Sequence, residues 1–469
     1  MDFDNLKDEL LAIIDTSLKF ARTIDNKAEF EIFLFFQNQA KININQGVVD
    51  ASDGIVAGSA VRTVKGATKH KKVSFASASG LDINQIKTNI EEASAVNNAM
   101  RVEDNRFESF CAPKTSVGKE GILSDEILKV TAGDLMPKTI ALIKDAESVD
   151  ARIKQISISM NASWGGFAIG NTNGVQQASR HTTNSQITGC LAIDGDERKQ
   201  GYEFAVSREK LVELEGVGQK AAKKALNLLS GKKLNETTTL PTIWDPVAAA
   251  CYVRASLGQS VLGSNIIEGM SPLQDKIGDQ VASPFFTLVD DGQKPAGLAT
   301  DIVDAEGYPQ RRKIVIEKGI LKTYLFDSYY ASIFGAQSTG NCTRTSGIFG
   351  SNPPYEISPR NGASNLETSA GTKTEEELIA SIDGRAILIR DMPMGIFHSS
   401  VATGDFSAVA NSAFLIEKGE IITPLKVASV AGGFYEGLKN IIEIGGNKQL
   451  TPFGVEIPSL VIDGFSIVA

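Results

Sequence analysis

Histidine is the scarcest side chain in this sequence that could bind a metal or transfer a proton. The chain has three, His70, His181 and His398, each more than a hundred residues from the next. A zinc motif built on two neighbouring histidines needs both within about one turn of helix, so the sequence contains no such two-histidine motif. It also lacks the GxxxxGK[ST] phosphate-binding loop, a GxGxxG after a strand and the GxSxG nucleophile turn. Local motifs therefore assign no metal, nucleotide or serine-nucleophile site.

Two other groups of residues could support chemistry. The stretch Asp301-Ile-Val-Asp-Ala-Glu-Gly lacks the alternating carboxylate spacing of an EF-hand, which favours a polar loop over a calcium site. His398 with Asp405 could form the acid–base pair of a self-sufficient hydrolase. His398 lies in a loop-like stretch, however, which favours a surface or loop-bonded histidine over a catalytic one. The hydrolase interpretation stays open at this point.

The composition is that of an acidic globular protein. Hydrophobic residues make up 42% and charged residues 22% of 469, and the net charge is −9. A protein with this net negative charge lacks the positive electrostatic potential that attracts a phosphate backbone. We therefore expect no direct contact with nucleic acid. The four cysteines lie far apart with no CxxC, and no signal peptide is evident at the N-terminus. No apolar run approaches the roughly 18 residues of a membrane span, so we expect a cytoplasmic protein with no membrane contact.

The order of predicted elements indicates an α+β fold in three parts. Residues 4–20 and 82–96 have the apolar spacing of helices and flank strand-like runs, which predicts an N-terminal α+β domain over 1–105. A central α+β domain follows over 106–232. The remainder, 233–469, is predicted as a large, mostly antiparallel, β-rich domain of metallopeptidase-like type that contains one buried helix.

Several segments carry more specific signals. Residues 125–146 are predicted to be helical with an internal break, and residues 207–229 to form one long helix. Glycines 319 and 419 each follow Ile-Glu-Lys between strand-like runs, which predicts two tight hairpins, since glycine adopts positive φ without strain.

The predicted buried helix begins at a clear capping signal. Asp245 is a good N-cap, and Pro246 occupies the first helical position, where its missing N–H costs nothing. Val253, Leu257 and Val261 then share one face of a continuous helix. We expect this face to be buried.

Several of these segments together resemble the TldD/TldE (PmbA) family, which is named both for modulation of DNA gyrase and for zinc metallopeptidase subunits. The resemblance covers nearly the whole chain, and the segments occur in the family's order. They are INQGVVD at 44–50, VASPFFTLVDDG at 281–292, AEG at 305–307, DSYYA at 327–331, STGN at 338–341, TGDFS at 403–407 and FLIEKGEI at 414–421.

The resemblance also implies where a metal site would lie. The family's peptidase subunit carries HExxxH shortly before the VASxxxTxVDDG segment, and in this sequence its histidine, glutamate and second histidine fall on Arg254, Ala255 and Gln259. A further cysteine ligand of the family falls on Ile444. The site is degenerate at these positions, so the chain is most similar to the metal-free TldE/PmbA branch. We therefore expect no catalytic residue, metal or other cofactor in this chain.

The resemblance implies a function through a partner. It predicts a subunit of a cytosolic TldD–TldE metallopeptidase complex, in which a TldD-like chain binds zinc and the heterodimer cleaves unfolded peptides. Whether a homodimer also forms is left open. The alternatives are a non-enzymatic modulator of DNA gyrase and the self-sufficient hydrolase considered above.

Overall fold

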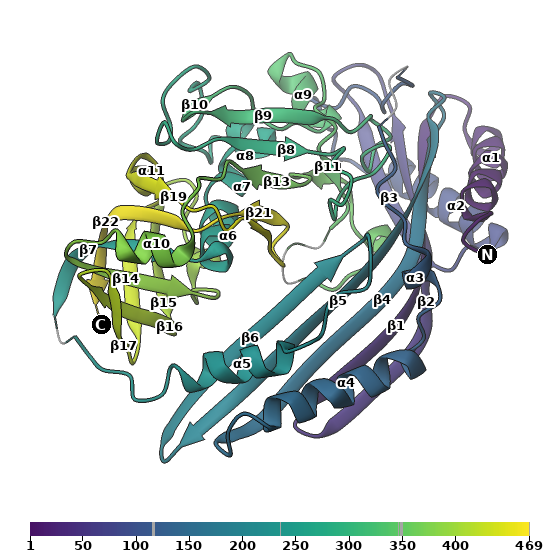
Figure 1. Cartoon of the computed structure of the whole chain (residues 1–469). Coiled ribbons are helices and arrows are strands. Elements are labelled where there is room, and N and C mark those ends of the chain that lie inside the picture. Colours follow the sequence, from purple (N-terminus) through teal and green to yellow (C-terminus); the bar gives the residue numbers. More distant parts are fainter. Residues whose placement is uncertain (115–117, 235, 346, 348–349, 469) are drawn as a thin grey trace.

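The N-terminal part of the molecule is built on one long antiparallel sheet (Figure 1). The computed structural model describes the chain except residues 115–117, 235, 346, 348–349 and 469. The sheet has the order β3-β2-β1-β4-β5-β6. Its strands are β1 (Glu29–Asn45), β2 (Val48–Lys65), β3 (Lys72–Ser79), β4 (Ile153–Asn171), β5 (Gln176–Asp194) and β6 (Glu197–Ser207). Because β1 pairs with β4, this sheet crosses residue 105, and the division of the chain into three domains stays a prediction.

The two faces of this sheet have different coverings. The helices that precede or pack on it are α1 (Leu6–Ile24), α2 (Ile83–Ala99), α3 (Asp125–Leu128), α4 (Ala132–Glu147) and α5 (Val217–Leu226). Side chains alternate along a strand, and even-numbered residues of β1 from Phe30 to Ile44 pack beneath the helices. Odd-numbered Phe33 and Phe35 instead pack against Val303 and Tyr308 of the C-terminal region. The sheet therefore lies between a helical layer and the C-terminal region.

Two predicted helices differ from the structure. The predicted helix over 207–229 is wrong in its first half, because β6 runs to Ser207 and helix α5 begins only after Gly216, whose φ is +69°. Tertiary contacts explain the difference, since the buried Arg208 side chain bonds to carbonyls of residues 297 and 300. The predicted break within 125–146 is real but lies before Ala132, where Thr131 caps α4.

The C-terminal region is rich in short strands arranged mainly in two sheets. One has the order β10-β9-β8-β13-β21-β20, and the other has the order β15-β18-β22-β7-β14-β16-β17, with β19 pairing to β22. Their pairings are antiparallel except β13 with β21 and β14 with β7. The strands are β7 (Thr237–Trp244), β8 (Leu288–Asp291), β9 (Arg312–Glu317), β10 (Ile320–Leu321), β11 (Cys342–Thr343), β12 (Arg360–Asn361), β13 (Leu366–Thr368), β14 (Arg385–Arg390), β15 (Asp405–Ala410), β16 (Ser412–Glu417), β17 (Glu420–Pro424), β18 (Ala428–Gly433), β19 (Ile441–Ile444), β20 (Gln449–Leu450), β21 (Val455–Ile457) and β22 (Leu460–Val468).

The α+β fold class predicted from the sequence is confirmed. Helices of the C-terminal region are α6 (Pro246–Ala255), α7 (Leu257–Ser260), α8 (Gly263–Ile267), α9 (Ser328–Phe334), α10 (Glu375–Ala380) and α11 (Phe434–Lys439). Both hairpins form as predicted, with Gly319 at φ +81° between β9 and β10 and Gly419 at φ +82° between β16 and β17. Within the described chain, no helix is both long and apolar enough to cross a bilayer.

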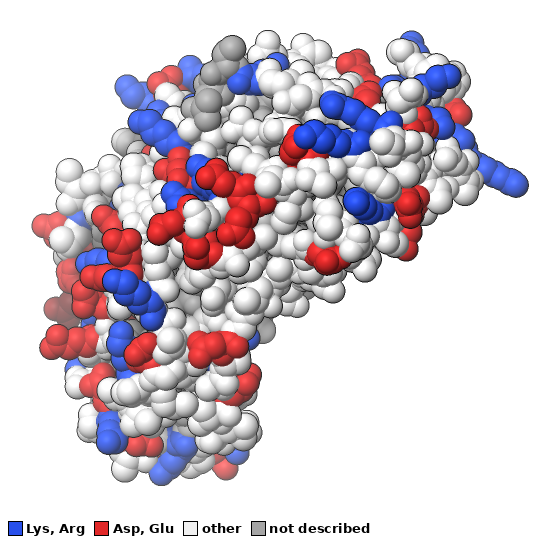
Figure 2. All heavy atoms as spheres, turned by 90° about the vertical axis from the view of Figure 1, so that its right-hand side faces the viewer, with Lys and Arg blue, Asp and Glu red and all other residues white. Residues whose placement is uncertain are grey.

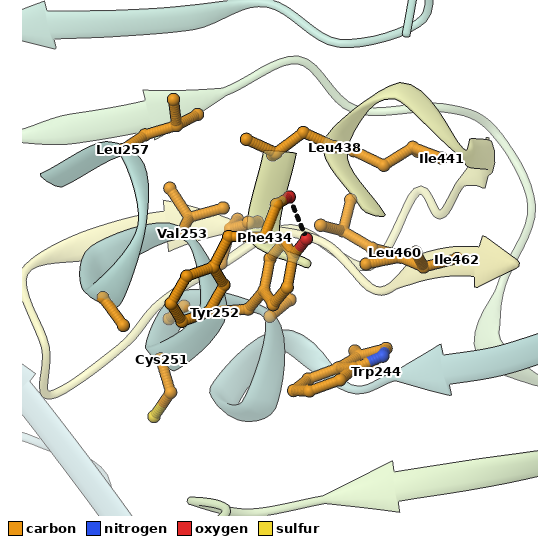
Figure 3. Close-up of a cluster of buried hydrophobic side chains, with 14 of the residues drawn as sticks. Trp244, Cys251, Tyr252, Val253, Leu257, Phe434, Leu438, Ile441, Leu460 and Ile462 are labelled. Carbon is orange, nitrogen blue, oxygen red and sulfur yellow. Dashed lines mark hydrogen bonds between the residues drawn. The ribbon is translucent and has the colours of Figure 1, made fainter. Parts of the chain in front are cut away.

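The largest hydrophobic core surrounds α6 (Figure 3). Tyr252 on this helix lies among Trp244, Phe434 and other apolar side chains, and its hydroxyl donates to the Phe434 carbonyl. Val253 and Leu257 are fully buried, as the sequence predicted. The predicted continuous helix is nevertheless interrupted at Ser256, which separates α6 from α7.

Leu257→Ala should destabilise the fold strongly. The side chain is 0% exposed, and truncation of a buried leucine to alanine costs about 2–5 kcal/mol of unfolding free energy. Urea unfolding measures the difference. Ile442→Ala is the control, because Ile442 is 51% exposed and a surface change costs within about 0.5 kcal/mol. Equal losses in the two variants would contradict the assigned core.

Candidate functional site

Helix α6 carries Arg254 and Ala255, two of the four residues at which the sequence resemblance predicts the family's metal motif. The Asp245 carboxylate accepts a hydrogen bond from the Ala248 N–H at 2.8 Å, which caps the helix as the sequence predicted. The helix ends at Ala255, and the Ser256 hydroxyl donates back to the Tyr252 carbonyl at 2.7 Å. This back-bonding is typical of a serine that bends a helix. Positions 254 and 259 therefore lie on two helical segments rather than on one.

The structure places the four aligned residues in different surroundings. Ala255 and Ile444 are 6% and 7% exposed and belong to the same hydrophobic core. Arg254 is largely enclosed, whereas Gln259 on α7 is exposed to solvent. Two of the four positions are therefore core positions.

Arg254 is a buried cation with an incomplete set of partners. Its Nε is buried and makes no hydrogen bond within the described residues. Burial lowers the pKa of its guanidinium, and the nearby carboxylate of Asp290 opposes this shift. The helix thus directs a positive charge toward the strand that carries Asp290.

Asp290 is the centre of a fully enclosed polar network. Its carboxylate is 2.7 Å from Lys313 Nζ and accepts hydrogen bonds from the Asn341 amide at 2.9 Å and from the Ser364 backbone N–H at 2.6 Å. Lys313 also donates to the Asn341 side-chain oxygen at 3.0 Å. The network ties β8, β9 and two loops together, which is the arrangement of a structural ion pair.

A second buried cluster joins the inner face of the N-terminal sheet to the C-terminal loops. Arg62 makes two bonds to Glu31, at 2.7 and 2.8 Å, and contacts Glu306 at 3.3 Å. Arg344 contacts the same Glu31 at 3.1 Å and lies over the Phe33 ring at 4.4 Å from its centroid. Four charged groups from distant parts of the chain therefore meet at this junction.

Two aspartates beside this cluster, Asp304 and Asp327, have raised pKa values. Burial, and then repulsion from Glu306, raises the pKa of Asp304 and of Asp327 well above the usual range. Asp304 nonetheless accepts hydrogen bonds from the N–H groups of Glu306 at 3.0 Å and Tyr308 at 2.9 Å. Its other oxygen accepts from the Cys342 N–H at 3.0 Å. Asp304 thus orders the 304–308 loop.

Sequence reasoning missed this cluster as a site. The spacing around Asp304 predicts only a polar loop, and nothing in local spacing links Glu31 to Arg62, Glu306 or Arg344. The segments that carry the family resemblance contain Glu306 and the neighbouring Asp327, which is the one signal in the sequence. Folding brings them together over as many as 313 positions of sequence.

The histidines do not form a hydrolytic site with the partners considered from the sequence. His398 and Asp405 are both exposed, and no hydrogen bond or ion pair joins their side chains. His70 is at the β2–β3 hairpin, where it contacts Glu103 at 2.7 Å. Over the part of the chain that the structure describes, no three His, Cys, Asp or Glu side chains are grouped so that they could hold a metal ion.

Asp245→Asn should remove a pH-dependent cost of folding. Burial, and then repulsion from Asp391, raises the pKa of Asp245 from 3.8 to about 7. The folded state therefore holds this proton more tightly than the unfolded state, and stability falls as the pH rises from about 4 through 7. Asparagine keeps the cap without the charge, so the gain from the substitution should grow by about 2 kcal/mol between pH 5.5 and pH 8.

Urea unfolding at the two pH values measures this gain. Asp405→Asn, at an exposed position, is expected to change stability by less than about 0.5 kcal/mol at either pH. A gain from Asp245→Asn that is the same at both pH values would contradict the assignment of Asp245 as a raised-pKa group.

Comparison with known families identifies the class of this protein. Residues 237–469 match the PmbA/TldA metallopeptidase C-terminal domain, and residues 127–229 match the central domain of the same family. The protein is therefore metallopeptidase-like in class. The chain belongs to the PmbA/TldD family.

Individual relatives and solved structures agree with this assignment. The chain is 27% identical to a metalloprotease PmbA homolog of Haemophilus influenzae over 84% of its own length and 82% of the relative. It is 24% identical to a metalloprotease TldD homolog of Buchnera aphidicola over 69% of each chain. The crystal structure of TldE from Thermococcus kodakarensis superposes with a TM-score of 0.85 at 22% identity, covering 97% of this chain and all of that one. A protein from Thermotoga maritima described as a modulator of a DNA gyrase gives a TM-score of 0.82 at 21% identity, covering 97% and 99%.

Proposed function

We propose that this chain is the metal-free, TldE/PmbA-like subunit of a cytoplasmic metallopeptidase complex that cleaves unfolded peptides. A TldD-like chain is its partner in a heterodimer and carries the zinc. This chain contributes no catalytic residue and no cofactor. It helps to enclose the substrate and to hold the partner in its active arrangement.

The donor chemistry of the four aligned positions carries this proposal. Zinc in proteins is bound by imidazole, thiolate or carboxylate groups. Arg254 brings a fixed positive charge, and Ala255 and Ile444 have no donor atom. Gln259 offers only an amide on a separate, exposed helical turn. These residues do not fit a zinc ion.

The packing around α6 supports the same proposal. Ala255 and Ile444 fill a continuous core, so a metal and its bound water would need space that side chains occupy. The Asp290 carboxylate is already paired with Lys313 and is not free to act as a base. The helix is retained as a structural element around which two sheets pack.

Strand addition gives a physical basis for peptide binding by such a complex. Strands β3 and β6 are the edges of the long N-terminal sheet, and an edge strand presents unpaired backbone N–H and C=O groups. An extended peptide that pairs with an edge is held through its backbone, with little dependence on its sequence. This mode suits unfolded substrates of varied composition.

Direct binding of DNA is not part of the proposal. On the face in Figure 2, the blue lysine and arginine side chains are interspersed with red aspartate and glutamate, without a continuous basic area among the described residues. The net charge of −9 adds a repulsive term toward a phosphate backbone.

The purified chain should contain no stoichiometric zinc. Elemental analysis after desalting, with a zinc-loaded metallopeptidase as the positive control, measures the ratio of zinc to protein. We expect far less than one zinc per chain, because the aligned positions supply no ligand set. A ratio near one would overturn the assignment to the metal-free branch.

A further inference from the structure

A cavity lies between the inner face of the N-terminal sheet and the loops of the C-terminal region. Its volume is about 320 Å³. The sheet side is aromatic, with Phe33 and Phe35 from β1 and Phe167 from β4, and the Phe33 and Phe167 rings stack at 5.6 Å between centroids. The opposite side is formed by loops that include residues 298–305 and 340–344. The space suits a small ligand with an apolar body.

Arg208 lines this cavity as a buried cation without an ion pair. The residue is 1% exposed, and its Nη1 donates to the carbonyls of Gly297 at 2.9 Å and Thr300 at 2.7 Å. Its Nε and Nη2 make no hydrogen bond, and no carboxylate lies within 4.0 Å among the described residues. Burial lowers the pKa of this guanidinium, and the nearby carboxylates of Asp301 and Glu120 oppose this shift. A buried charge left in this state is costly, and an anionic ligand would relieve that cost.

Two further side chains on the cavity have unused hydrogen-bonding groups. Arg344 is 4% exposed, and its Nε lacks a partner among the described residues. His181 stacks on Phe35 at 6.5 Å, and no described residue hydrogen-bonds to its ring nitrogens. Burial, and then the charge of Arg208, lowers the pKa of His181 to about 3, so the ring is neutral and donates one N–H.

The two aspartates that line the same side of the cavity, Asp301 and Asp304, already accept hydrogen bonds from the protein. Asp304 has its oxygens bonded to backbone N–H groups of its own loop and of Cys342. Asp301 accepts from the Ser179 hydroxyl at 2.8 Å, and burial raises its pKa to about 6. The unsatisfied groups of the cavity are therefore mainly donors, and three of them are nitrogens of the Arg208 and Arg344 guanidinium groups.

We propose that this cavity binds an apolar carboxylic acid, with the carboxylate paired to Arg208 and the apolar body packed on Phe33, Phe35 and Phe167. The carboxylate would pair with Nε and Nη2 of Arg208, which have no hydrogen-bond partner among the described residues. The same chemistry occurs in a free small acid and in the C-terminal residue of a peptide. The assignment holds whether or not the chain works as a peptidase subunit.

Binding is tested with probes that differ only at the carboxylate. Isothermal titration with N-acetyl-L-phenylalanine should show saturable binding, and its amide should bind at least tenfold more weakly. A decapeptide that ends in phenylalanine, compared with its C-terminal amide, separates the two sources. Preference for the acid in either pair supports the proposal, and the pair that shows it names the source. Equal binding of acid and amide in both pairs, or no binding of any probe, overturns it.

Substitutions locate the binding in the cavity. Thr183 lines the cavity from β5, so Thr183→Phe should fill it and abolish binding of the acid. Ile187→Phe is the matched control, because Ile187 follows on the same face of β5, is 47% exposed and does not line the cavity. Arg208→Gln should reduce affinity for the acid to that for the amide. Unchanged binding in folded Thr183→Phe would place the ligand elsewhere and overturn the proposal, even if the Arg208 variant fails to fold.

Discussion

Peptide cleavage is expected only when this chain is mixed with a TldD-like partner. Alone, the chain should leave a disordered peptide intact, because Arg254, Ala255 and Gln259 provide neither a zinc-bound water nor a general base. The mixture should cleave the peptide, and a zinc chelator should abolish that cleavage. The measurement compares this chain, the partner and the mixture on one unfolded substrate.

A restored motif provides the control for this prediction. Arg254→His, Ala255→Glu and Gln259→His together should not create activity in the isolated chain. Residue 444 would still be isoleucine, the supporting partners of the new histidines would be missing, and Ser256 separates the two helical segments that would carry them. Chelator-sensitive cleavage by the unmodified chain alone would contradict the proposed function. Equal cleavage by the partner and the mixture would show that this subunit is dispensable.

Asp290→Ala should be among the most destabilising single substitutions in the C-terminal region. It removes the carboxylate partner of the buried ammonium of Lys313 and one of the two acceptors of the Asn341 amide. Removal of one member of a buried ion pair costs about 3–5 kcal/mol of unfolding free energy. Chemical unfolding measures this loss, and the Leu257→Ala variant gives a scale for it.

The neighbouring aspartate is a matched control. Asp291 lies next in the same strand, but its nearest cation, Arg312, is 3.7 Å away and 52% exposed. Asp291 also accepts a hydrogen bond from the Gln293 N–H at 2.9 Å, so Asp291→Ala should cost about 1–2 kcal/mol, less than Asp290→Ala. Similar losses at positions 290 and 291 would show that the Asp290 network does not act as a structural ion pair.

Local chemistry in the sequence correctly predicted several parts of the fold. Glycines 319 and 419 identified two hairpins, because a tight turn needs positive φ at that position. Asp245 and Pro246 identified the start of α6, because capping depends on neighbours within three residues.

The local sequence could not predict where a helix starts late or is interrupted. The segment after Ser207 has an apolar helical period, but the Arg208 side chain bonds to the carbonyls of residues 297 and 300. The helix begins at Val217, ten residues later than predicted. The break at Ser256 likewise depends on how α6 and α7 pack within the core. Tertiary contacts outweigh helix propensity in both places, since propensity differs by less than about 1 kcal/mol per residue.

The sequence by itself determined the α+β class, the two hairpins and the start of the capped helix α6. Each of these depends on residue chemistry or on neighbours close in the chain. Only the tertiary structure decided that Glu31, Arg62 and Glu306 form one buried cluster, and that Arg208 lines a cavity as an unpaired cation. The physical reason is that burial and charge pairing are set by segments hundreds of residues apart, which no local pattern records.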